Sequence, residues 1–72
     1  MSKLPVVSGN KVIRALVKVG YYVRGKESNH VHLRHPDRKP LTMPDHRGIT
    51  RGTLRTIIRE AGFTVDEFRQ LL

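Results

Sequence analysis

The sequence lacks cysteine and tryptophan and carries only six acidic residues among its 72. Without cysteine, a disulfide framework and a thiolate zinc site are both excluded. No apolar run approaches the ~20 residues of a membrane-spanning helix, and the short apolar stretch at residues 4–7 is far below the length of a signal-peptide core. These absences predict a cytoplasmic protein with no membrane association.

Positive charge is what the chain has in excess. Fourteen Lys and Arg residues against six acids give a net charge of +8 and a pI near 10.9. Such an excess of positive charge indicates a polyanion such as nucleic acid as the binding partner. An acidic protein and an anionic membrane surface are the competing interpretations. Because the charge is spread over the whole chain instead of forming one basic tail, we favour nucleic acid.

Three of the four histidines fall in one short segment, which reads His30-Val31-His32-Leu33-Arg34-His35-Pro36. In a β-strand, alternate side chains point to opposite faces of the sheet. One face would then carry the set Val31, Leu33 and His35, and the other the set His30, His32 and Arg34. The segment therefore predicts a strand with an apolar face for the core and a cationic, histidine-bearing face for a ligand.

Two helices are predicted from apolar spacing and end signals. A helix over about residues 9–19 begins at Ser8 and ends before Gly20, with an apolar stripe of Val12, Ile13, Leu16 and Val17. A second ends before Gly62 and has an apolar stripe of Leu54, Ile57, Ile58 and Ala61. On another side of this second helix lies a stripe of Arg51, Arg55 and Arg59.

A short third helix is predicted by a capping box formed by Thr64 and Glu67. Its apolar face would consist of Phe68, Leu71 and Leu72.

Three strands lie between the first two helices. We expect them at residues 21–24, 30–35 and 41–43, joined by polar turns at 25–29 and 36–40. Connections this short allow only an antiparallel meander. The expected fold is therefore α+β, in the order α-β-β-β-α-α, with helices on one face of a three-stranded sheet and the His30 face left open. Tyr21 and Tyr22 should lie on opposite faces, one in the core and one exposed.

With these elements in place, the chain resembles the HicA-type toxins of toxin–antitoxin pairs, which are mRNA interferases with a fold similar to the double-stranded RNA-binding domain. The resemblance covers nearly all of residues 1–72 as a single toxin domain. It starts with Ser8-Gly9 and Gly20-Tyr21 and includes the histidine segment. It is strongest in Arg51-Gly52-Thr53-Leu54-Arg55-Thr56-Ile57-Ile58-Arg59-Glu60-Ala61-Gly62.

The resemblance implies an RNA-cleaving toxin that is held inactive by a cognate antitoxin of the HicB type. The family's functional histidine lies five residues before the histidine of an Arg-His-Pro, which places the catalytic role on His30. The family pattern has Gly-Ser before that histidine, whereas this chain has Ser28-Asn29, so the turn before the site differs. The family also places a histidine at the position of His46.

The residues fit this implied chemistry. RNA supplies its own 2′-OH nucleophile, so cleavage needs a base, an acid and cations around the phosphate, and histidine serves either proton-transfer role near neutral pH. The six scattered carboxylates offer no two-metal site, and His30, His32 and His46 match known zinc sites poorly, so we expect no metal and no cofactor. Candidate RNA contacts are Arg24, Lys26, His32, Arg34, His46, Arg51 and Arg55.

Two other interpretations stay open at this point. The first is a non-catalytic RNA-binding module of the same fold, in which the departure at Ser28-Asn29 has removed activity. The second is a protein-interaction domain whose basic surface serves to bind an acidic antitoxin.

Overall fold

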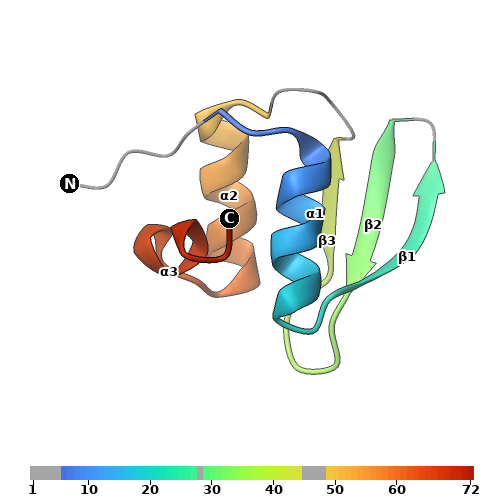
Figure 1. The fold of residues 1–72 in the computed structure, drawn as a ribbon. Helices are drawn as coiled ribbons and strands as arrows, with labels where there is room; N and C mark the ends of the chain where they lie inside the picture. The colour runs from blue at the N-terminus through green and yellow to red at the C-terminus, as the bar shows by residue number, and fades with distance from the viewer. Residues whose placement is uncertain (1–5, 28, 45–48) are drawn as a thin grey trace.

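The computed structural model of the protein describes residues 6–27, 29–44 and 49–72. Its elements follow the order α1 (Gly9–Lys18), β1 (Tyr22–Glu27), β2 (His30–Arg34), β3 (Leu41–Pro44), α2 (Arg51–Ala61) and α3 (Val65–Arg69). The three strands form an antiparallel sheet in the order β1-β2-β3, and the helices lie together on one side of it (Figure 1). The predicted α+β class, element order and meander are confirmed.

The core lies between the sheet and the helix layer. The fully or almost fully buried side chains on the sheet are Val31, Leu33, Leu41 and Met43, and those on the helices include Val12, Leu16, Leu54, Ile58 and Phe68. Full burial of one such side chain contributes about 1.5–3 kcal/mol relative to exposure. The apolar stripes and the strand alternation select these positions, so the hydrophobic pattern largely determines which face of each element is covered. The predicted stripe of α1 was wrong at Val17, which is 50% exposed, because the buried face of this helix centres on Val12, Ala15 and Leu16.

The helix ends are set by local hydrogen bonds. Ser8 accepts a hydrogen bond from the Lys11 N–H at the start of α1. The left-handed Gly62 ends α2 with φ of 87°. At α3 both halves of the capping box form, because the Thr64 hydroxyl accepts from the Glu67 N–H at 3.1 Å and the Glu67 carboxylate accepts from the Thr64 N–H at 2.8 Å. These end signals act over three or four residues, which is why the sequence predicts them.

The first strand is longer than predicted. Residues 25–27 were expected in a polar turn, but β1 continues to Glu27, which pairs with His30. Only residues 28 and 29 lie between these paired positions. The prediction was wrong because the polar Gly25-Lys26-Glu27 stretch lacks the alternation of a half-buried strand, whereas its backbone hydrogen bonds to β2 stabilise the extended conformation.

Several other element ends differ by one or a few residues from the prediction. Val19 lies after α1, Tyr21 lies before β1 and His35 lies after β2. The third strand includes Pro44, whose Cα is the register partner of His30. At the C-terminus α3 ends at Arg69, so Leu72 lies beyond the helix and is 41% exposed, whereas Phe68 alone among the predicted apolar residues of α3 is fully buried.

Two hydrogen bonds of His35 link the end of α1 to the turn that follows β2. The Asp37 N–H donates to His35 Nδ1 at 2.9 Å, and His35 Nε2 lies 2.8 Å from the Val19 carbonyl oxygen. A backbone N–H can only donate and a carbonyl can only accept, so the neutral ring carries its proton on Nε2. The ring also meets Tyr21 edge-on, with centroids 4.8 Å apart. His35 therefore has a structural role beneath the sheet and at the 36–40 turn.

The two consecutive tyrosines face opposite ways, as expected. Tyr21 is buried and its hydroxyl donates to the Lys39 carbonyl at 2.9 Å, whereas Tyr22 is about half exposed. Burial raises the pKa of Tyr21, an effect that the nearby positive charge of Arg38 partly offsets. The hydroxyl therefore stays protonated and available as a donor.

Arg38 ties the 36–40 turn to the end of α2. Its Nη1 donates to the Ala61 carbonyl at 2.7 Å, and its guanidinium carbon lies 4.2 Å from the centre of the Phe63 ring. This contact satisfies a helix-end carbonyl and adds a cation–π interaction. Arg38, one of the fourteen basic residues, therefore makes contacts that stabilise the fold.

Candidate nucleic-acid interface

The face of the sheet opposite the helices carries the predicted histidine pair. Along β2 the side chains of Val31 and Leu33 are buried, whereas His30 and Arg34 are exposed and His32 is partly exposed. Cross-strand pairing places Glu27 and Pro44 beside His30, and Gly25 and Thr42 beside His32. The strand alternation predicted from the sequence is confirmed, and it gathers the functional candidates of β2 on the open face.

A groove of about 560 Å³ lies on the sheet, lined by residues of all three strands and of the turn before β3: Arg24, Gly25, Lys26, Glu27, His32, Leu33, Arg34, Pro40, Leu41 and Thr42. Four of the predicted RNA contacts, namely Arg24, Lys26, His32 and Arg34, are among them. Lys26 is the register partner of the buried Val31, so its side chain points to the helix side of the sheet and it lines the groove through its backbone. The side chains of Arg24, Arg34 and His32, with the carboxylate of Glu27 beside them, give the groove a net positive charge that suits an anionic chain such as an RNA backbone.

The groove owes its shape to an irregularity in β1. The pairing of β1 with β2 shifts register between Val23 and Gly25, which leaves Arg24 as the extra residue of a β-bulge. The next residue, Gly25, is the partner of His32, and a β-carbon on it would meet no atom within 4 Å. The space beside His32 is therefore open because the facing position has no side chain.

His32 is held by contacts to both neighbouring strands. Its Nδ1 lies 3.0 Å from the Thr42 hydroxyl oxygen on β3, and its Nε2 lies 3.8 Å from a carboxylate oxygen of Glu27 on β1. The hydroxyl is a good hydrogen-bonding partner at that distance, whereas the carboxylate is 86% exposed and interacts mainly through charge. The sequence prediction named His32 but neither of its partners.

His30 begins β2, across from Pro44 at the end of β3. It is exposed, and it is not among the described residues that line the groove, which begins at its neighbour on the same face, His32. A substrate chain lying along β2 would thus meet His30 first and the groove next.

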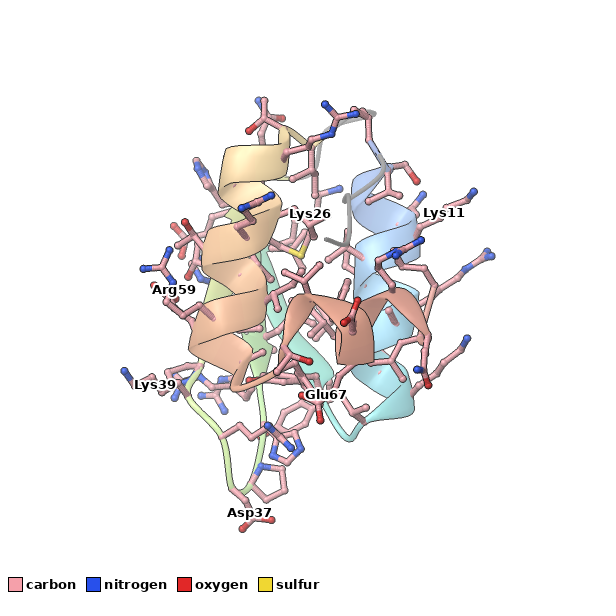
Figure 2. All side chains as sticks on the ribbon, turned by 90° about the vertical axis from the view of Figure 1, so that its left-hand side faces the viewer. Lys11, Lys26, Asp37, Lys39, Arg59 and Glu67 are labelled. Carbon is pink, nitrogen blue, oxygen red and sulfur yellow. The ribbon has the colours of Figure 1, made fainter. Side chains whose placement is uncertain are left out.

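The remaining candidates lie elsewhere. Arg51 and Arg55 are exposed on α2, in the helix layer, and neither lines the groove. In Figure 2, which views the helix layer, Arg59 of the same stripe points away from the body of the protein. His46 lies outside the described residues. The structure therefore gathers the side chains of Arg24, His32 and Arg34 at one groove and places the side chain of Lys26 on the other face and the α2 arginines in the helix layer.

Within residues 6–27, 29–44 and 49–72, no three His, Asp or Glu side chains gather closely enough to hold a metal ion. None of the helices in those ranges is long and apolar enough to cross a bilayer.

The family model described as the HicA toxin of bacterial toxin–antitoxin systems matches residues 9–63, from the start of α1 to the residue after the α2 cap. No curated protein matches the chain. The match covers the whole sheet and both long helices, and so includes His30 and the groove.

Proposed function

This chain belongs to the HicA toxins of bacterial toxin–antitoxin systems, and we propose that it is an endoribonuclease that cleaves mRNA without a metal ion, with His30 as a general acid or base. The observation that carries the proposal is the position of His30 on the open, cationic face of the sheet, directly before the groove. The cytoplasm is the compartment where such a substrate is found.

The chemistry requires few groups. The RNA 2′-OH attacks the adjacent phosphorus, the bond from phosphorus to the 5′-oxygen breaks, and the products are a 2′,3′-cyclic phosphate and a 5′-OH. A protein group must take the 2′ proton and another must protonate the leaving oxygen. An imidazole at the exposed start of β2 can perform either transfer near neutral pH. Cations beside the phosphate stabilise the charge of the transition state.

The groove supports the binding half of the proposal. The groove that contains His32 is also lined by Arg24 and Arg34. We assign these side chains to phosphates adjacent to the scissile one, so that substrate lies along β2. The exposed Tyr22, the register partner of Arg34, offers an aromatic face on which a base can stack.

The partner class follows from the family, since toxins of these systems are paired with antitoxins. We propose that the cognate antitoxin is of the HicB type. A net charge of +8 favours an acidic partner surface, and the proposal predicts that antitoxin and RNA compete for the open face.

The deciding experiment is cleavage of a long mRNA in EDTA by the wild type beside His30→Ala. We expect cleavage by the wild type and a loss of at least about 10²-fold in the variant, since that is the usual contribution of a general acid or base. Lys11→Ala serves as a control, because Lys11 is exposed on α1, in the opposite layer.

Three results would contradict the proposal. Equal cleavage by the wild type and His30→Ala would remove His30 from the chemistry. Cleavage lost in EDTA and restored by a divalent ion would reject the metal-independent route. RNA retained on a gel by a wild type that cleaves nothing would favour the non-catalytic binding module.

A further inference from the structure

The contacts of His32 bear on the second proton transfer, for which the proposed function names no group. His32 lies two residues from His30 on the same strand and the same face. Side chains in this relation stand about 6.6 Å apart, twice the strand rise of about 3.3 Å per residue. In-line displacement at phosphorus needs its base and its acid on opposite sides of the phosphate. Two imidazoles at this spacing can flank one phosphate group.

The ring of His32 is oriented by its partners. Thr42 lies directly across from His32 in the register, and its hydroxyl oxygen is 3.0 Å from Nδ1. A hydroxyl accepts from a protonated Nδ1 whether the imidazole is neutral or cationic. When Nδ1 donates to Thr42 throughout, Nε2 is the nitrogen that loses and regains a proton. In that arrangement Thr42 positions the ring and makes Nε2 the reactive nitrogen.

The charged groups around Nε2 are the carboxylate of Glu27 and the guanidinium groups of Arg24 and Arg34, which line the same groove. An acid must begin the reaction as the imidazolium ion, and a cationic His32 has the carboxylate of Glu27 as a counter-charge at 3.8 Å. The same carboxylate is highly exposed, so it can move aside when a phosphate approaches. The missing side chain at Gly25 leaves the approach to this part of the strand open.

We propose that His32 is the general acid and His30 the general base of the cleavage; this inference rests on the proposed function. Neutral His30 takes the proton of the 2′-OH as the 2′-oxygen bonds to phosphorus. The bond from phosphorus to the 5′-oxygen breaks, and Nε2 of cationic His32 gives its proton to that oxygen. The step leaves His30 cationic and His32 neutral, and exchange with water restores both.

The test compares two RNA substrates, one ordinary and one with sulfur in place of the 5′-bridging oxygen at the scissile bond. A thiolate leaves without being protonated, so loss of the acid matters only for the oxygen substrate. We expect His32→Gln to cleave ordinary RNA about 10²–10³-fold more slowly than the wild type and to cleave the sulfur substrate at nearly the wild-type rate. His30→Ala should be slow on both.

Two outcomes would overturn the assignment alone, leaving the proposed function intact. One is a wild-type rate for His32→Gln on ordinary RNA, and the other is an equal deficit of that variant on both substrates. A wild type that cleaves neither substrate would overturn the assignment and the proposed function together.

A second pair of variants tests the role of Thr42. Thr42→Val should slow cleavage of ordinary RNA and Thr42→Ser should restore it, while both melt near the wild-type temperature. The pH–rate profile adds a readout that packing alone would not move, because loss of a general acid removes the alkaline limb of a bell-shaped profile. An unchanged alkaline limb in His32→Gln would contradict the proposal.

Discussion

Gly20 lies against the imidazole of His35: a β-carbon placed on the glycine would fall 2.8 Å from Nε2, the same nitrogen that contacts the Val19 carbonyl. The glycine also has φ of 104°, a backbone conformation that other L-residues rarely adopt. Two separate constraints thus act on one residue, at the corner where α1 turns into β1.

Gly20→Ala should therefore destabilise the protein by about 1–3 kcal/mol, the usual cost of a non-glycine residue in such a conformation. Thermal unfolding measures this directly. The matched control is Gly52→Ala on α2, where an added β-carbon meets no atom within 4 Å. If both variants melt together with the wild type, the contact between Gly20 and His35 has no energetic role.

Charge at the groove should determine the salt dependence of RNA binding. Arg34→Gln removes one predicted phosphate contact, so the slope of log K against log salt concentration should become shallower by roughly 0.7 for single-stranded RNA. Arg14→Gln removes the same charge from an exposed position of α1 and serves as the control. Filter binding at several salt concentrations gives both slopes, and equal slopes would place the RNA elsewhere.

The shape of the groove can be tested without changing charge. Gly25→Leu introduces a side chain beside His32 at a position with ordinary φ and open space. We expect RNA affinity to fall about tenfold, or about 1.4 kcal/mol, with little change in melting temperature. Gly52→Leu is the equivalent change outside the groove. Undiminished RNA affinity in Gly25→Leu would show that the substrate does not enter this hollow.

The capping box of α3 should make stability depend on pH in the acid range. The hydrogen bond from the Thr64 backbone lowers the pKa of Glu67 below its ordinary value of 4.5. A depressed pKa in the folded state means that the carboxylate adds stability above about pH 4.5, and that this stability is lost as the pH falls through the lower folded value.

Glu67→Gln should accordingly melt below the wild type at pH 7, and the difference should shrink as the pH is lowered below 4.5. Calorimetry at pH 7, 4 and 3 measures the trend. A difference that is constant with pH would show that the charge of Glu67 contributes nothing.

The sequence predicts those parts of the fold that depend on short-range signals. The caps at Ser8 and Thr64 and the terminator Gly62 act within one helical turn, and the alternation along β2 identifies its covered face. The length of β1 was mispredicted because pairing with a neighbouring strand, rather than the propensity of Gly25 or Glu27, extends it.

For the candidate site, the sequence likewise predicts what depends on short-range pattern and misses what depends on strand pairing. Alternation places His30, His32 and Arg34 on one face, whereas the role of His30 came only from the family resemblance and stays a prediction. The contact of His32 with Thr42 depends on the register between β2 and β3, and a shift of one residue would turn Thr42 to the other face. Only the folded chain shows that partner.

The bulge at Arg24 has a consequence for solubility. As the outermost strand of the sheet, β1 has one side that β2 does not cover, and it carries exposed Tyr22 and Val23. A flat strand of this kind is a template for pairing with another copy of the chain. The bulge interrupts the regular hydrogen-bond spacing immediately after Val23, and the charged Arg24, Lys26 and Glu27 that follow keep the rest of the edge hydrophilic. The extra residue Arg24 therefore contributes to the groove on the face of the sheet and also disfavours pairing of the β1 edge with another copy.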